Sequence, residues 1–195
     1  MNLRECFDRH GCDKGCRHGY ERVYGPAFND LRYKPIRLLE IGIYQGASLA
    51  AWVDFFPNAE IFGIDTFQRV QPEDIPILNH PRVKWRQHDS TTPGDFGQFD
   101  IIIDDGLHTH VSQRKTFDNF MPYAKMYFIE DVWAFSHMTE DEKMHRWPVR
   151  GYLHNEYSEE AYSRLFRSLS PYVLEFHDMR DGCRPDSFII QAEHR

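Results

Sequence analysis

The sequence predicts an α/β fold, with an open and mostly parallel sheet of about seven strands that ends in an antiparallel hairpin. Three observations support it. Short apolar runs alternate with segments of helical period, which is typical of a parallel sheet covered by helices. The run FDIIID at 99–104 is continuous, like strands that are buried on both faces. Two strand-like runs near the C-terminus flank RDGCRP, a turn with glycine and proline. Together these features predict a Rossmann-like sheet.

The strands are expected at apolar runs that are bounded by turn residues. These runs cover residues 37–43, 60–65, 82–89, 99–104, 126–131, 172–179 and 186–193. The run at 82–89 alternates apolar and charged residues, so we expect it at a more exposed place in the sheet.

Helices are expected where the apolar period lengthens, at 46–56, 110–121 and 158–169. In the first of these, Leu49, Trp52, Val53 and Phe56 fall at helical spacing, and Pro57 lies just beyond the expected end.

Composition and charge limit the class of protein. The chain has 195 residues, 41% of them hydrophobic, which suits a single globular domain over 1–195. No apolar run approaches the length of a membrane span, and the charged first residues lack a signal-peptide core, so we expect a cytoplasmic protein. The net charge is −7 and the basic residues are scattered, which argues against a nucleic-acid partner.

The N-terminal stretch CFDRHGCDKGCRHG combines three cysteines with two histidines: Cys6, Cys12, Cys16, His10 and His18. Its spacing lacks the C-x2-C pairs of common structural zinc sites, so zinc is not favoured. In a cytoplasmic chain the cysteines are expected to be reduced.

Ligands of parallel sheets bind at the carboxyl ends of the strands, so the residues there are the candidates for a site. After the first strand, Glu40 precedes a turn with Gly42 and Gly46 that leads into a helix. Tyr44 stands at the middle position of G-x-G-x-x-G, which makes a dinucleotide less favoured. After the next strand, Asp65 could accept the hydroxyls of a ribose.

Further along, Asp89 is a candidate partner for an adenine amino group. Each of these residues could also be an ordinary strand-end cap or turn residue.

Two other strands end in acid pairs, and the pairs are expected to lie side by side. Asp104 and Asp105 precede His108, and Glu130 and Asp131 follow the next strand. Adjacent carboxylates repel one another unless a cation lies among them. Oxygen-rich clusters suit a hard divalent ion such as Mg²⁺. Read singly, each pair could be a solvated cap; their coincidence with the glycine turn favours a functional site.

The segments LLEIGIYQGASL, FGID, IIIDDGLHTH and FIEDVW, in this order, resemble the class I S-adenosylmethionine-dependent methyltransferases. The closer similarity is to the metal-dependent sugar O-methyltransferases of macrolide and rhamnosyl antibiotic pathways, with the cephalosporin-hydroxylase-like group beside them. It extends from DKGCRHGYERVYGPAF to about Trp133, roughly two-thirds of the chain.

The resemblance implies specific roles at the candidate site. It implies S-adenosylmethionine and Mg²⁺, or another divalent cation, as cofactors. The implied metal ligands are Asp105, Glu130 and Asp131, with His108 as the catalytic base. The residues implied for the cofactor are Glu40, Gly42, Gly46 and Asp65, with Asp89 added from its position. Lys14, Gly15, His18 and Tyr20 match a recurring family segment without an assigned role.

The predicted activity is therefore methyl transfer to a hydroxyl of a sugar, whether a nucleotide sugar, a glycan or a glycosylated natural product. A metal-dependent hydroxylase-like enzyme, a catechol-type O-methyltransferase and a non-catalytic nucleoside-binding module are the alternatives. We expect residues 1–35 to form an N-terminal cap and 133–157 to form a substrate lid or, equally, a peripheral loop. The sequence leaves open whether the protein is a homo-oligomer.

Overall fold

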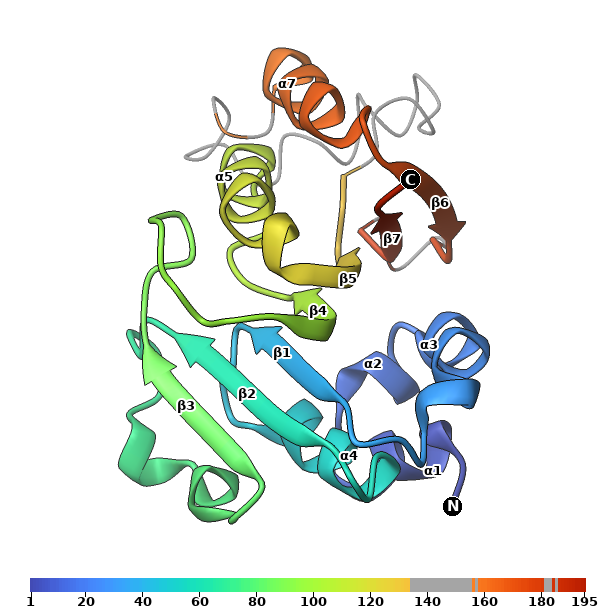
Figure 1. Ribbon diagram of the computed structural model, residues 1–195, viewed down its shortest axis with the longest axis vertical. Helices are drawn as coiled ribbons and strands as arrows, with labels where there is room; N and C mark the ends of the chain where they lie inside the picture. The colour runs from blue at the N-terminus through green and yellow to red at the C-terminus, as the bar shows by residue number, and fades with distance from the viewer. Residues whose placement is uncertain (134–155, 157, 181–183, 185) are drawn as a thin grey trace.

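The computed structural model describes residues 1–133, 156, 158–180, 184 and 186–195 (Figure 1). Within them, seven strands form one sheet in the order β3-β2-β1-β4-β5-β7-β6. The strands are β1 (Arg37–Ile41), β2 (Glu60–Asp65), β3 (Val83–Gln87), β4 (Phe99–Asp104), β5 (Ala124–Ile129), β6 (Val173–Asp178) and β7 (Phe188–Glu193).

The sheet has the predicted mixed topology. Strands β1 to β5 are parallel, and β7 runs antiparallel between β5 and β6. The order along the sheet reverses between β1 and β4, so their carboxyl ends form the switch point at which open sheets bind ligands. The predicted fold class is confirmed, including the exposed position of β3, which forms one edge of the sheet and buries only Val83.

Helices cover both faces of the sheet. They are α1 (Leu3–Arg9), α2 (Asp13–Cys16), α3 (Glu21–Phe28), α4 (Ala47–Phe55), α5 (His110–Phe120) and α7 (Glu159–Leu169). Short 3₁₀ turns are η1 (Asn29–Leu31), η2 (Pro72–Asp74), η3 (Pro76–Asn79) and η4 (Met121–Tyr123). None of the helices in the described part of the chain combines the length and the apolar character that a membrane span requires.

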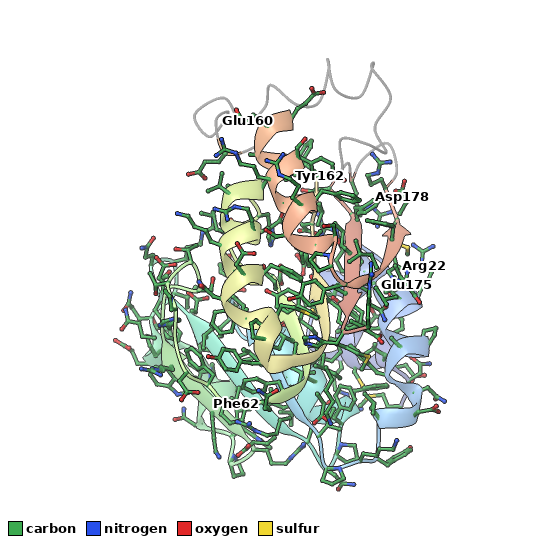
Figure 2. The ribbon with its side chains drawn as sticks, turned by 45° about the horizontal axis from the view of Figure 1, so that its top comes forward. Arg22, Phe62, Glu160, Tyr162, Glu175 and Asp178 are labelled. Carbon is green, nitrogen blue, oxygen red and sulfur yellow. The ribbon has the colours of Figure 1, made fainter. Side chains whose placement is uncertain are left out.

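The core lies in two layers because strand side chains alternate between the faces of the sheet. Leu38, Ile101 and Ile103 pack in the cluster that includes α1, α3 and α4. Leu39 and Ile102 pack in the other cluster, under α5 and α7. Figure 2 shows α5 and α7 side by side, where Tyr162 of α7 lies 5.1 Å from the ring of His110.

The N-terminal helices are fixed to the sheet by aromatic packing. Tyr24 of α3 contacts Trp52 of α4 edge-on, with ring centroids 5.6 Å apart, and Phe128 of β5 at 5.2 Å. Phe7 of α1 contacts the same tryptophan at 5.1 Å. Residues predicted as a cap thus hold α3 close to the carboxyl end of β5.

Helix α5 begins where the sequence predicted and ends one residue earlier. Thr109 caps its first turn and forms a capping box with Ser112, which satisfies backbone N–H groups that the helix leaves unpaired. His110 is fully buried at the first helical position, and its Nε2 lies 2.8 Å from the carbonyl oxygen of Trp133. Most of the predicted lid, 134–155 and 157, lies outside the described residues. This part includes His137, Trp147 and Tyr152, whose rings the sequence offers for stacking on a sugar.

Candidate active site

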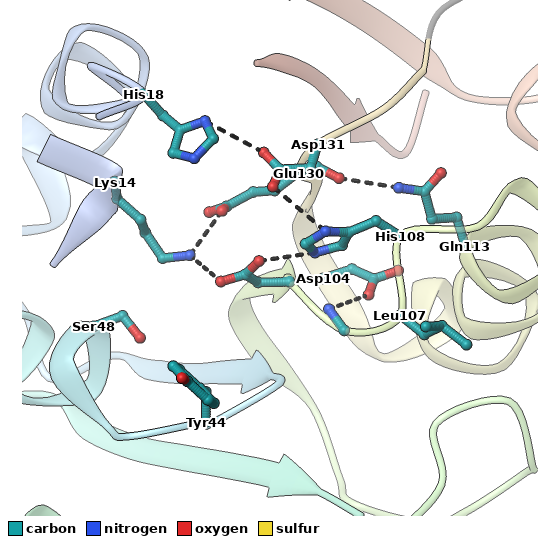
Figure 3. A network of polar contacts seen from close by, with 12 residues as sticks. Lys14, His18, Tyr44, Ser48, Asp104, Leu107, His108, Gln113, Glu130 and Asp131 are labelled. Atoms are coloured by element: carbon teal, nitrogen blue, oxygen red, sulfur yellow. Dashed lines mark hydrogen bonds and ion pairs between the residues drawn. The ribbon is translucent and has the colours of Figure 1, made fainter. Parts of the chain in front are cut away.

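The carboxyl ends of β1, β4 and β5 meet at the switch point, where the backbone holds the acids that follow the strands. The N–H of Asp105 donates to the carbonyl of Ile41 at 2.9 Å, and the N–H of Glu130 donates to the carbonyl of Asp104 at 3.0 Å. Strand pairing therefore continues one residue past β4 and β5. As a result the two predicted acid pairs lie together, as Figure 3 shows.

We call Asp105, Glu130 and Asp131 the acid triad. Asp131 has φ of +53°, in the left-handed region that aspartate tolerates better than most residues. Glu130 is 1% exposed. All three side chains contact the N-terminal segment: Asp105 and Glu130 accept from Lys14, and Asp131 accepts from Tyr20.

Lys14 of α2 places its ammonium among carboxylates from three strand ends. Its Nζ donates to Glu130 Oε2 at 2.7 Å and to Asp105 Oδ2, and it lies 3.4 Å from Glu40 Oε1. Lys14 is 2% exposed. Burial alone would lower the pKa of Lys14, but the neighbouring negative charges, of Asp105 first, raise it well above its usual value. The lysine therefore stays charged.

His108 bridges the other side of the triad. Its Nε2 lies 3.0 Å from Asp105 Oδ1 and its Nδ1 lies 3.4 Å from Asp131 Oδ2. Burial disfavours the imidazolium, but the charges of Asp131 and Asp105 outweigh it and raise the pKa of His108 to about 9. In this state the imidazole holds its second proton at neutral pH.

Two buried phenols complete the network. Tyr20 donates to Asp131 Oδ1, and Tyr24 donates to Glu130 Oε1 at 2.5 Å. Burial and the adjacent carboxylates raise the pKa of both tyrosines well above the usual value, so both keep the proton they donate. His18 Nδ1 lies 2.7 Å from Ser187 Oγ and 3.7 Å from Asp131 Oδ1.

Each of the six carboxylate oxygens of the acid triad therefore has a partner within the protein. The two oxygens of Asp105 contact Lys14 and His108. Those of Glu130 contact Lys14 and Tyr24. Those of Asp131 contact Tyr20 and His108.

The acids differ in how their surroundings shift their pKa values. Burial raises the pKa of Asp105, but the charge of Lys14 and the hydrogen bond from His108 outweigh it, so its pKa lies well below the usual range. Burial raises the pKa of Glu130 and of Asp131 despite the nearby cations. The site thus holds one firmly ionised carboxylate beside two that burial makes harder to ionise.

Asp104 and Glu40 lie beneath the triad and are both buried. Asp104 accepts from the N–H of Gly106 at 3.3 Å and from the phenol of Tyr127 at 3.4 Å. Glu40 accepts from Ser48 Oγ at 2.8 Å, while its Oε1 makes no hydrogen bond. Burial raises the pKa of each acid to about 7.

The glycine turn after β1 packs against the strand end that carries Asp105. Gly42 has φ of +95°, and a Cβ there would lie 2.1 Å from the carbonyl oxygen of Asp105. Gly46 has φ of +79°, and a Cβ there would lie 2.5 Å from Ile77 of η3. In both cases the group that lies close to the glycine is protein, and an approach of the turn to a ligand stays a prediction.

Asp65 holds the same turn through its carboxylate. Its Oδ2 accepts from the N–H groups of Ile43 at 2.8 Å and Tyr44 at 3.1 Å, and its Oδ1 accepts from the N–H of Phe67 at 2.7 Å. An ionised carboxylate has about four acceptor positions, so Oδ1 keeps one for a further donor. Tyr44 is 56% exposed above the turn.

Asp89 lies on the exposed loop after β3, away from the triad's hydrogen bonds. Its Oδ1 accepts from the hydroxyl of Thr91 at 2.7 Å and from the N–H of Thr91 at 2.9 Å, and these bonds lower its pKa. The loop is tied to α5 because Asn119 donates to the carbonyl of Ser90 at 2.9 Å.

Among the described residues, the one group of His, Cys, Asp and Glu side chains close enough to hold a metal ion is Asp105, His108 and Asp131. Their candidate ligand atoms lie within 4.8 Å of one another. Glu130, which the sequence assigned as a ligand, faces Lys14. The cysteines of the described part of the chain, Cys6, Cys12 and Cys16, belong to no such group. Cys6 and Cys12 are buried, and burial raises the pKa of both thiols, which makes them poor nucleophiles.

Sequence reasoning did not assign roles to the N-terminal residues that donate hydrogen bonds to the triad. Lys14 and Tyr20 belong to the segment of family resemblance but had no role, and Tyr24 was not singled out. The i, i+4 spacing of Tyr20, Tyr24 and Phe28 is the available signal, because it places the three rings on one face of α3.

No family model matches the chain. Curated relatives do. A Streptomyces olivaceus 8-demethyl-8-(2-methoxy-alpha-L-rhamnosyl)-tetracenomycin-C 3'-O-methyltransferase is 35% identical in a match of 144 residues that covers 65% of this chain and 35% of that protein. Mycinamicin VI 2''-O-methyltransferase of Micromonospora griseorubida is 31% identical over 148 residues, 68% of this chain and 36% of that protein. The chain spans little more than a third of the length of these relatives.

Solved structures share the fold. The mycinamicin-pathway methyltransferase MycE, described as a complex with Mg and SAH, matches with a TM-score of 0.58 and 24% identity, over 100% of this chain and 49% of its own. The SAH-bound Podospora anserina methyltransferase PaMTH1 matches with a TM-score of 0.63 and 16% identity, over 99% of this chain and 87% of its own. The resemblance drawn from the sequence is thereby confirmed.

Proposed function

We propose that this chain, which has the class I methyltransferase fold and resembles the sugar O-methyltransferases over two-thirds of its length, transfers a methyl group from S-adenosylmethionine to a sugar hydroxyl. The observation that carries the proposal is the acid triad with His108, set beside the glycine turn at the switch point of the sheet.

Asp105, Glu130 and Asp131 would hold Mg²⁺ or another divalent cation. Their carboxylate oxygens are the ligands that hard cations prefer, and the ligand atoms of Asp105 and Asp131 already lie within 4.8 Å. When bound, the ion would stabilise negative charge on the acceptor oxygen.

His108 is the proposed base. It lies at the rim of the triad, and its side chain is 21% exposed. A proton acceptor must first be neutral, and here the carboxylates of Asp105 and Asp131 hold the second proton on the ring. The ring must therefore lose its second proton before turnover, and a divalent ion held by the carboxylates would favour this by offsetting their charge. One nitrogen could then take the hydroxyl proton while the other stays bonded to a carboxylate; such a base contributes about 10²–10⁴-fold.

The cofactor is proposed to lie along the glycine turn. Asp65 would use its remaining acceptor position for a ribose hydroxyl, and Glu40 would support the turn from below through Ser48. Gly42 and Gly46 hold the turn close to Asp105 and η3. Asp89 is proposed near the adenine amino group from its place after β3.

The acceptor is proposed to be a deoxysugar on a natural product, because the curated relatives are named as O-methyltransferases of a rhamnosyl-tetracenomycin and of mycinamicin VI. The cytoplasmic location, the single domain over 1–195, its cap at 1–35 and its lid at 133–157 stay predictions.

The test uses the full chain with S-adenosylmethionine, Mg²⁺ and a panel of rhamnosides and deoxysugar glycosides, and measures S-adenosylhomocysteine. We expect turnover that chelation of the metal abolishes and that Asp105→Asn and His108→Ala each reduce strongly. Asp118→Asn is the matched control, since Asp118 pairs with Arg114 on the exposed face of α5. Cofactor binding by calorimetry without transfer to any sugar would instead favour a binding module. Turnover of flat phenols alone would favour the catechol type.

A further inference from the structure

We infer that Lys14 is a built-in counter-ion of the acid triad, which competes with the divalent cation for the same carboxylate oxygens and so sets the metal affinity of the site. The inference rests on the proposed metal site and goes beyond it, because it concerns a residue that is not itself a ligand.

The position of the ammonium carries the argument. Nζ contacts Asp105 Oδ2 and lies 2.7 Å from Glu130 Oε2, and these two acids belong to the proposed ligand set. Glu40, at 3.4 Å, supplies the third carboxylate. An ammonium has three donors and a compact charge, so it can face three carboxylates from three strand ends, which a planar guanidinium fits less well.

The remaining oxygens of the two ligands are also occupied, which makes sharing difficult. Asp105 Oδ1 faces His108, and Glu130 Oε1 accepts a hydrogen bond from the phenol of Tyr24. A cation that binds both acids through the oxygens that face Lys14 must enter beside the ammonium or displace it, and one that shares the other two oxygens still comes close to the ammonium. Two positive charges at such a short distance repel each other strongly in a buried site, because burial weakens the screening by water.

The backbone of Lys14 is fixed in the fold, so only its side chain is free to move. The carbonyl of Lys14 accepts from the N–H of Tyr20 at 2.7 Å. The next residue, Gly15, packs so tightly that a Cβ there would lie 2.7 Å from Phe7 Cβ. The backbone of α2 thus stays docked, and a cation would have to move the four-carbon side chain alone.

The experiment compares divalent-ion binding by the wild-type chain and by Lys14→Met, using isothermal titration with Mg²⁺ and Mn²⁺ in the absence of acceptor. We expect the variant to bind at least about tenfold more tightly, because it removes a competing charge from the oxygens. Lys125→Met is the matched control: Lys125 pairs with Asp100 at 2.7 Å on the surface, and its loss should leave the affinity unchanged.

Thermal unfolding of the same proteins provides the second measurement. Without metal, Lys14→Met should melt below the wild type, because its acids have lost a cation, and added Mn²⁺ should raise its melting temperature more than that of the wild type. If Lys14→Met does not fold, Lys14→Gln, which keeps a donor but no charge, takes its place in both measurements.

The outcomes separate the inference from the proposed function. Wild-type binding with unchanged or weaker binding by the variant overturns the competition and leaves the metal site standing. No binding by either protein overturns both. Tighter binding by the variant supports the competition, even where the wild type binds too weakly to measure.

Discussion

Gly42 is the residue at which the glycine turn and the acid triad are mechanically linked, so Gly42→Ala should damage both stability and site. Alanine at φ of +95° enters a backbone region that costs a side chain about 1–2 kcal/mol. Its Cβ would also lie 2.1 Å from the carbonyl oxygen of Asp105, where an ordinary contact needs at least 3.4 Å. Relief of such overpacking typically costs about 1–3 kcal/mol more.

The expected loss of unfolding free energy is therefore about 2–5 kcal/mol, which lowers the melting temperature of a chain of this size by roughly 5–15 °C. Because Asp105 must move by more than about 1 Å, we also expect at least a tenfold loss of divalent-ion affinity, and a loss of methyl transfer on the order of 10²-fold. Thermal unfolding and isothermal titration measure the first two effects directly.

Gly11→Ala is the matched control. Gly11 also has a left-handed φ, +63°, but a Cβ there would meet nothing within 4 Å. It should cost only the backbone part, about 1–2 kcal/mol, and leave ion binding intact. The reasoning is refuted if Gly42→Ala has the same melting temperature as Gly11→Ala and binds the ion as tightly as the wild type. The close approach of Gly42 to Asp105 would then affect neither stability nor ion binding.

Three further predictions concern the polar network. Tyr24→Phe removes the donor to Glu130 Oε1 and should cost about 1–3 kcal/mol in urea unfolding; a cost equal to that of the exposed Tyr33→Phe would contradict a structural role for this phenol. The pKa of His108 is raised from 6.5 to about 9 in the folded state. The protonated ring therefore stabilises the folded protein fully below pH 6.5, and this stabilisation is lost as the pH rises through 9. The stability gap between the metal-free wild type and His108→Gln should therefore narrow with rising pH, and a constant gap would disprove the assigned shift. Asp65→Asn weakens the bonds from Ile43 and Tyr44, so S-adenosylmethionine should bind at least about tenfold more weakly by calorimetry; unchanged affinity would remove Asp65 from the cofactor site.

The sequence predicted the fold and the gathering of the acids for a physical reason. Alternating periods identify strands and helices, and parallel strands necessarily bring their carboxyl ends to one edge. Asp105, Glu130 and Asp131 follow adjacent strands, so their proximity needed no knowledge of distant contacts.

The N-terminal residues that donate hydrogen bonds to these acids could not be predicted in the same way. Lys14 lies 91 positions before Asp105 and 116 before Glu130, and Tyr20 lies 111 before Asp131. No local period encodes such pairs, because they depend on how α2 and α3 dock on the finished sheet. The partner of Gly42 was unpredictable for the same reason: the turn signals a close approach without specifying the group that approaches.

The same long separations bear on how the chain acquires its structure during synthesis. Lys14, Tyr20 and Tyr24 leave the ribosome before Asp105, Glu130 and Asp131 have been made, so this part of the network cannot form until the residues that follow β5 are complete. Contacts between residues so far apart in the sequence slow folding, because a long loop of chain must close before the contacts can stabilise the structure. Until then, the acids have to stay hydrated, since burying them without Lys14 would be costly. We therefore expect docking of the N-terminal helices and dehydration of the acid triad to be a single late event in folding.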